Sequence, residues 1–166
     1  SNSSAASDVY KRQVNGTAKG ASRMSRTCEA VKVAEDVYWV GAIDWAIRNF
    51  HGYLTSRGTT YNAYLVLADK ITLIDTVKAP FADEMFARIS SVIAPEQIRY
   101  VVSNHAEMDH SGALPQTIRR IRPERVFASV MGTEALRRHF QLEGIAAVSD
   151  GEKINLGNME ITFIET

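Results

Sequence analysis

The spacing of hydrophobic residues along the chain predicts several strands, followed by alternating helices and strands. Valine and aromatic residues alternate with polar ones over residues 31–40, which is typical of a hairpin. Apolar runs at 61–67 and 71–75 predict two further strands joined by a turn at 68–70. Hydrophobic residues then recur at helical spacing over residues 80–92, which predicts a helix that buries one stripe, including Met85 and Phe86.

The second half of the chain alternates strands with helices. Residues 97–102 form an apolar run that predicts a strand, and residues 113–121 predict a helix with Pro115 in its first turn, where proline is tolerated. The remaining predicted elements are a strand at 125–129, a helix from a cap at Thr133 to about Phe140, and strands at 145–148 and 159–164. This order predicts a sheet covered by helices, with the chemistry on loops at one edge.

Composition and charge narrow the class of protein. With 166 residues, 45% of them hydrophobic and 23% charged, the chain fits one globular domain with a sizeable core. Nineteen basic residues balance nineteen acidic ones without a run of like charge, so neither nucleic acid nor a membrane surface is an expected partner. The sequence contains no apolar stretch of membrane-spanning length and no signal-peptide core. The single Cys28 excludes an internal disulfide, and these features together predict a cytoplasmic protein.

The two ends of the chain differ from its middle. Residues 1–23 are rich in serine, alanine, glycine and asparagine and lack apolar periodicity, so we expect a disordered leader or a non-native remnant. Met24 is a plausible start, and residues 24–166 form the expected domain. The strand predicted near the C-terminus stops without a cap or turn, which indicates a fold that is cut before its end.

Four side chains of the kinds that bind metals follow the apolar run at 100–102. They are His105, Glu107, Asp109 and His110. The first three alternate, so an extended backbone would direct them to one side, while His110 can turn toward a second point. One loop could therefore serve two adjacent metals. The alternative is a polar surface loop that carries two histidines by chance, which four ligand-type residues directly after a buried strand argue against.

The ligand types also constrain the metal. Imidazole nitrogen combined with carboxylate oxygen, and without thiolate, is typical of iron, manganese or zinc sites. Glu107 stands where zinc hydrolases of the metallo-β-lactamase superfamily carry a histidine. An additional carboxylate favours iron that cycles between oxidation states. His139, near the end of a predicted helix, is not expected to bind the metal.

From about Val33 to Thr166 the sequence closely resembles the metallo-β-lactamase-like domain of flavodiiron proteins, also called A-type flavoproteins or rubredoxin:oxygen oxidoreductases. The motif His-x-Glu-x-Asp-His-Ser-Gly at residues 105–112 is the most specific match, because its glutamate separates it from the hydrolase branch. The other matching phrases are VGAIDW at 40–45, FHGY at 50–53, GTTYNAYLV at 58–66 and DTVKA at 75–79.

This resemblance implies an α+β fold, the metallo-β-lactamase-like αββα sandwich, of which the chain is the incomplete N-terminal half. It also implies a non-haem diiron centre, in which His105 and Glu107 would bind one iron and Asp109 and His110 the other. The remaining ligands, and a flavodoxin-like domain that binds FMN, would come later in the chain. The implied reaction reduces dioxygen to water or nitric oxide to nitrous oxide, with electrons from a rubredoxin-like donor. Head-to-tail homodimers would bring the FMN of one subunit near the diiron site of the other.

The resemblance suggests roles for two further residues. His51, within the long connection at 41–60, is a candidate proton donor or supporting group near the irons, or else an ordinary loop histidine. Asp75 matches an aspartate at a strand end that orients the ligand loop rather than binding metal. Two protein ligands per iron fall short of the three or four that hold a metal firmly. We therefore expect this chain alone to bind iron weakly and to lack reductase activity.

Two other interpretations stay open at this point. The first is a zinc-dependent metallo-hydrolase of the same fold, which would act through a metal-bound hydroxide. Glu107 argues against it. The second is a truncated domain without activity, which folds or pairs with a partner and does no chemistry.

Overall fold

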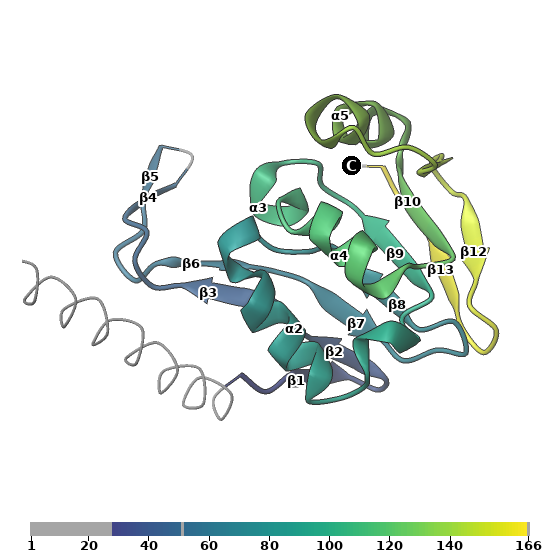
Figure 1. The fold of residues 1–166 in the computed structure, drawn as a ribbon, viewed down its shortest axis with the longest axis horizontal. Helices are drawn as coiled ribbons and strands as arrows, with labels where there is room; N and C mark the ends of the chain where they lie inside the picture. The colour runs from purple at the N-terminus through teal and green to yellow at the C-terminus, as the bar shows by residue number, and fades with distance from the viewer. Residues whose placement is uncertain (1–27, 51, 166) are drawn as a thin grey trace, which may run out of the picture.

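The computed structural model describes residues 28–50 and 52–165. Its main feature is a seven-stranded mixed sheet (Figure 1). In spatial order the strands are β1 (Val31–Ala34), β2 (Val37–Trp39), β7 (Tyr64–Val66), β8 (Thr72–Ile74), β9 (Tyr100–Ser103), β10 (Arg125–Ser129) and β11 (Ala146–Val148). The pairs from β1 to β8 are antiparallel, and those from β8 to β11 are parallel.

Each parallel pair is connected through helical segments, since parallel neighbours need a crossover. The crossovers contain η1 (Ala79–Phe81), α2 (Ala82–Ser90) and η2 (Pro95–Gln97), then α3 (Met108–Ser111) and α4 (Leu114–Ile121), and finally α5 (Val130–Phe140). In Figure 1, α2 and α4 lie side by side over one face of the sheet. The carboxyl end of β10 leads directly into α5, and that of β9 leads through residues 104–107 into α3; both helices border the candidate site.

The largest hydrophobic core lies between the sheet and these helices. Alternate strand residues such as Leu65, Leu73 and Val101 face the helices and are fully buried. From α2, Met85 and Phe86 pack into the same core, which confirms the buried stripe predicted from their spacing.

A hairpin covers part of the opposite face of the sheet. It consists of β12 (Lys153–Asn155) and β13 (Glu160–Thr162), which pair antiparallel. Leu156, between the two strands, is fully buried against Val66 and Ala68. Its carbonyl oxygen accepts a hydrogen bond from the amide of Lys70 at 2.8 Å. The sheet is therefore packed between helices on one face and a β-layer on the other.

The segment at 41–60, predicted as a long loop, contains four short strands, so this prediction is wrong. The strands are β3 (Ala42–Asp44), paired with β6 (Thr59–Tyr61), and β4 (Asn49–Phe50), paired with β5 (Tyr53–Leu54). Gly58 has a φ of +83° and lies so close to the carbonyl of Asp44 that a Cβ would clash with it. Glycine thus permits the return of the chain into β6.

Several other boundaries also differ from the prediction. The strand expected at 61–67 begins at Tyr64, because Tyr61 pairs within β6. The strand expected at 97–102 begins at Tyr100. The helix expected to start at Thr133 begins at Val130 and is capped by the Ser129 hydroxyl, which accepts a hydrogen bond from the Gly132 amide at 3.0 Å.

Some predictions fall outside the described residues, namely the leader at 1–23 and any role of His51. Within residues 28–50 and 52–165, no helix combines the length and the apolar character needed to cross a membrane.

Candidate metal centre

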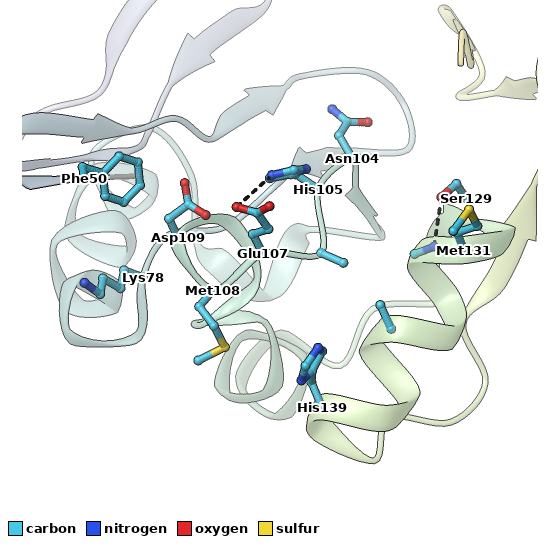
Figure 2. A pocket seen from close by; sticks show the side chains of 13 residues that line it. Phe50, Lys78, Asn104, His105, Glu107, Met108, Asp109, Ser129, Met131 and His139 are labelled. Carbon is cyan, nitrogen blue, oxygen red and sulfur yellow. Dashed lines mark hydrogen bonds and ion pairs between the residues drawn. The ribbon is translucent and has the colours of Figure 1, made fainter. Parts of the chain in front are cut away.

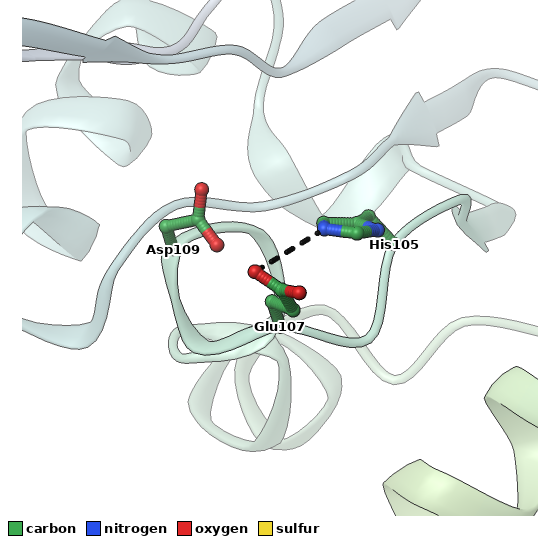
Figure 3. A group of neighbouring side chains, drawn as sticks. All are labelled: His105, Glu107 and Asp109. Carbon is green, nitrogen blue, oxygen red and sulfur yellow. Dashed lines mark ion pairs between the residues drawn. The ribbon is translucent and has the colours of Figure 1, made fainter. Parts of the chain in front are cut away.

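The ligand loop, residues 104–112, connects β9 to α4 and brings three of the four predicted ligands together. One ligand atom each from His105, Glu107 and Asp109 lies within 4.8 Å of the others (Figure 3). His105 and Glu107 are exposed and Asp109 is half-buried. The convergence occurs although the backbone is not extended throughout, because α3 begins at Met108. The predicted extended conformation is therefore wrong beyond Glu107.

His110 lies beside this group and forms a second pair with Asp109. The distance from His110 Nε2 to Asp109 Oδ2 is 3.4 Å, and the distance from His105 Nε2 to Glu107 Oε2 is 3.5 Å. The two imidazole rings meet edge to face with centroids 5.5 Å apart. His110 Nδ1 is buried and has no hydrogen-bond partner among the described residues. The loop thus presents two imidazole–carboxylate pairs next to each other.

Asp75 fastens the start of the loop to the end of β8. Its Oδ1 accepts hydrogen bonds from the amides of Asn104 at 2.7 Å and His105 at 3.4 Å. Burial raises the pKa of the Asp75 carboxyl, although these amides and nearby His110 act in the opposite direction. Asp75 has a φ of 58°, in the left-handed region, so its backbone is held in an unusual conformation. Asp75 therefore makes the contacts expected of a residue that orients the ligand loop.

Backbone contacts from residues 76–77 hold the rest of the loop. The amide and hydroxyl of Thr76 both donate to the carbonyl of His110, at 3.0 and 2.5 Å, and the amide of Ala113 donates to the carbonyl of Val77 at 2.8 Å. Ser111 Oγ lies 2.8 and 2.9 Å from the carbonyl oxygens of Ala106 and Glu107. Sequence reasoning missed Thr76 and Ser111, although each directly follows a residue it singled out.

A cavity of about 660 Å³ opens beside the ligand loop. Figure 2 shows the loop on one side and α5 on the other, with Phe50 and Lys78 beyond Asp109. The ligand loop contributes the carboxylate side chains of this lining, together with Ala106 and Met108. The other apolar lining residues are Met131 and Ala135 of α5 and Phe50. His139 also lines this cavity, but it is not part of the three-residue cluster.

A hydrogen-bonded pair lies near the Phe50 end of the cavity. The hydroxyl of fully buried Tyr61 donates to Asp44 Oδ2 at 2.9 Å. Burial and the Asp44 carboxylate raise the pKa of Tyr61, with a smaller contribution from Asp109. Tyr61 therefore stays protonated, and its ring packs edge-on against Phe81 with centroids 5.2 Å apart.

Comparison with known proteins gives the relatives of this chain. The profile of the family described as "ODP family beta lactamase" matches residues 59–166. The chain is similar to a rubredoxin-oxygen oxidoreductase of Megalodesulfovibrio gigas, with 47% identity over 141 residues, covering 83% of this chain and 35% of the relative. It is also similar to a nitric oxide reductase of Moorella thermoacetica, with 39% identity over 141 residues, covering 82% of this chain and 35% of the relative.

A solved structure with a similar fold is the flavodiiron protein from Giardia intestinalis. The two share 33% identity and a TM-score of 0.73, over 81% of this chain and 33% of that chain. The chain therefore spans about a third of the length of the relatives it matches.

Proposed function

The chain belongs to the family described as "ODP family beta lactamase", and we propose that its ligand loop is part of a non-haem diiron centre. This centre reduces dioxygen to water or nitric oxide to nitrous oxide. The resemblance to flavodiiron proteins and the α+β metallo-β-lactamase-like fold of the N-terminal part are both confirmed. The relatives named as rubredoxin-oxygen oxidoreductase and nitric oxide reductase support both gases as substrates.

The observation that carries this proposal is the convergence of His105, Glu107 and Asp109 within 4.8 Å, with His110 beside Asp109 at 3.4 Å. Imidazole nitrogens and carboxylate oxygens are suitable ligands for iron. In our proposal His105 and Glu107 hold one iron, and Asp109 and His110 hold the other. Asp75 positions the loop through its backbone amides.

The cavity is suited to a small uncharged substrate. When bound, the two irons would polarise a diatomic gas and supply electrons to it. Apolar residues on both sides of the cavity, such as Met108 in α3 and Ala135 in α5, suit the entry of such an uncharged gas. Lys78 places a positive charge at the same cavity, where the loop carboxylates are negative. In this proposal the residues of this chain hold the irons, orient the ligand loop and give the gas access to the site.

The proposal also covers a cofactor domain, an electron donor and an assembly that lie outside the described residues. It places the metal domain at residues 24–166, FMN in a flavodoxin-like domain outside this chain, and a rubredoxin-like protein as electron donor. It also includes a head-to-tail homodimer in the cytoplasm. The name of the Megalodesulfovibrio gigas relative supports the rubredoxin-like donor.

Anaerobic titration with iron(II) and zinc(II), followed by metal analysis, tests the proposal. Zinc(II) binds most nitrogen and oxygen sites more tightly than iron(II), so the informative quantity is the change in their affinity ratio between variants. We expect Glu107→Gln and Asp109→Asn to weaken iron binding and Glu107→His to shift the ratio toward zinc. His139→Gln, in the same cavity but outside the cluster, should change neither the iron affinity nor the ratio of iron to zinc affinity. Iron affinity that survives both Glu107→Gln and Asp109→Asn would contradict the proposal.

A further inference from the structure

Two exposed methionines lie at the cavity beside the ligand loop. Met108 in α3 is 55% exposed and Met131 in the first turn of α5 is 81% exposed, and both line the cavity. Two other described methionines lie elsewhere. Met85 is 0% exposed in the main core, and Met159 is half-buried in the hairpin on the opposite face of the sheet.

We propose that Met108 and Met131 are oxidation sites that receive partly reduced oxygen from the ligand loop and become methionine sulfoxides before other thioethers of the chain. This inference rests on the proposed function, because the oxidant is hydrogen peroxide formed when dioxygen takes up two electrons and two protons instead of four. The two thioethers would then intercept peroxide that leaves the site through the cavity.

The reaction is a two-electron oxygen transfer. A lone pair of the methionine sulfur attacks one peroxide oxygen, so that a sulfur–oxygen bond forms and the oxygen–oxygen bond breaks. The departing hydroxide takes up the proton released from the transferred oxygen and leaves as water. Sulfur loses two electrons and the peroxide gains them, which gives one sulfoxide and one water for each peroxide consumed.

The position of Met108 places its thioether close to the source of the oxidant. It lies between two candidate ligands, Glu107 and Asp109, and its carbonyl accepts the Gly112 amide at 3.0 Å, so its backbone is fixed in the loop. In Figure 2 its side chain points away from the Glu107 carboxylate, along the cavity, so it does not compete for the metal position. Because the residue is 55% exposed, peroxide that diffuses outward can reach its side chain.

Met131 lies on the other side of the same cavity. It follows the capping residue Ser129 by two positions, and its side chain lines both this cavity and a smaller one of about 440 Å³ that also reaches His105. Peroxide leaving by either cavity therefore meets the Met131 thioether. Sulfoxide formation at these positions would make part of the apolar lining polar, which would hinder the entry of an uncharged gas.

The test follows sulfoxide formation residue by residue. The chain is mixed with iron(II), ascorbate as the electron source and air, with catalase in solution to remove peroxide that escapes, and sulfoxides are quantified by peptide mass spectrometry. Val33→Met supplies a matched reporter, because Val33 is 52% exposed on the edge strand β1, outside the cavity. Glu107→Gln at the same iron concentration corrects for oxidation by unbound iron. Bound iron is measured in parallel.

We expect Met108 and Met131 to oxidise several-fold faster than the thioether introduced by V33M, and we expect Glu107→Gln to abolish this difference. With hydrogen peroxide alone, exposure should set the order, so that the reporter oxidises as fast as Met108. Equal oxidation of all exposed thioethers in the presence of bound iron would overturn the inference while leaving the proposed diiron site intact. An absence of both bound iron and selective oxidation would overturn the two together.

Discussion

Asp75 shows how one buried carboxylate can contact both ends of the ligand loop. Its Oδ1 accepts the amides that begin the ligand loop, while its Oδ2 lies 3.9 Å from His110 Nδ1 near the loop's end. The residue is almost fully buried and its backbone has a φ of 58°. A side chain at this position must therefore accept hydrogen bonds and tolerate a left-handed backbone, and asparagine is the closest substitute.

Replacing Asp75 should destabilise the protein by an amount that depends on the substituent. Asp75→Ala leaves the Asn104 and His105 amides without their acceptor and places alanine in the left-handed region, so we expect a loss of about 2–4 kcal/mol in the free energy of unfolding. Asp75→Asn keeps an acceptor oxygen and should lose less than half as much. Urea denaturation measures both variants. Equal losses would show that the amide hydrogen bonds do not contribute.

Asp44 should make stability depend on pH in the acid range. Burial raises the pKa of its carboxyl, but hydrogen bonds from Tyr61 and from the Ala46 and Ile47 amides outweigh burial and lower the pKa below its usual 3.8. Such a group stabilises the fold above its unfolded pKa, and this contribution disappears as pH falls through the folded pKa. The stability difference between wild type and Asp44→Asn should therefore be constant near neutral pH and shrink below about pH 4. Urea denaturation across a pH series checks this, and a constant difference down to pH 3 would contradict it.

At the level of elements, the sequence predicts those strands and helices whose formation depends on a local pattern of residues. The β1–β2 hairpin follows from alternating side chains, and the short strand β10 (Arg125–Ser129) has the predicted bounds. The strands β3 and β6 could not be predicted in this way, because they pair with each other across the whole segment, and β4 and β5 are too short, at two residues each, to show an alternating pattern. The helix α3 also depends on a distant partner, because the amide and hydroxyl of Thr76 donate to the carbonyl of His110 within it.

The start of α5 offers a direct comparison of two hydroxyls. Ser129 accepts the Gly132 amide, whereas Thr133 Oγ1 is buried without a hydrogen-bond partner among the described residues. We expect Ser129→Ala to cost about 1 kcal/mol through the lost cap. Thr133→Val should be neutral or stabilising, since it removes a polar atom that forms no hydrogen bond. Denaturant unfolding of both variants decides the matter, and a larger loss for Thr133→Val would assign the cap to Thr133 after all.

On the scale of the whole molecule, the candidate site combines one local motif with distant supports. The four ligand-type residues could be found from the sequence because they lie within six residues of one loop. The supports at Asp75 and Thr76 come from the end of β8, and the facing wall of the cavity comes from α5. Their meeting depends on the parallel pairing of β8, β9 and β10, which places the carboxyl ends of these strands at one edge.

This arrangement links metal binding to the stability of the entire fold. The ligand loop is tied to β8 and α4, so iron(II) that binds the folded state alone should raise the free energy of unfolding, by about 1.4 kcal/mol at a free concentration tenfold above Kd. For a chain of this size that corresponds to a rise of about 3–6 °C in the unfolding midpoint.

We expect a thermal-shift titration to require high iron concentrations, because four candidate ligands leave only two per iron, and we expect Glu107→Gln to abolish the shift. Oxygen electrode measurements on the same iron-loaded samples, supplied with a reduced rubredoxin-like donor instead of ascorbate, should show no catalytic turnover. Equal shifts in wild type and Glu107→Gln would mean that iron binds elsewhere. Nearly two tightly held irons per chain would instead mean that this loop and its neighbours supply more ligands than His105, Glu107, Asp109 and His110.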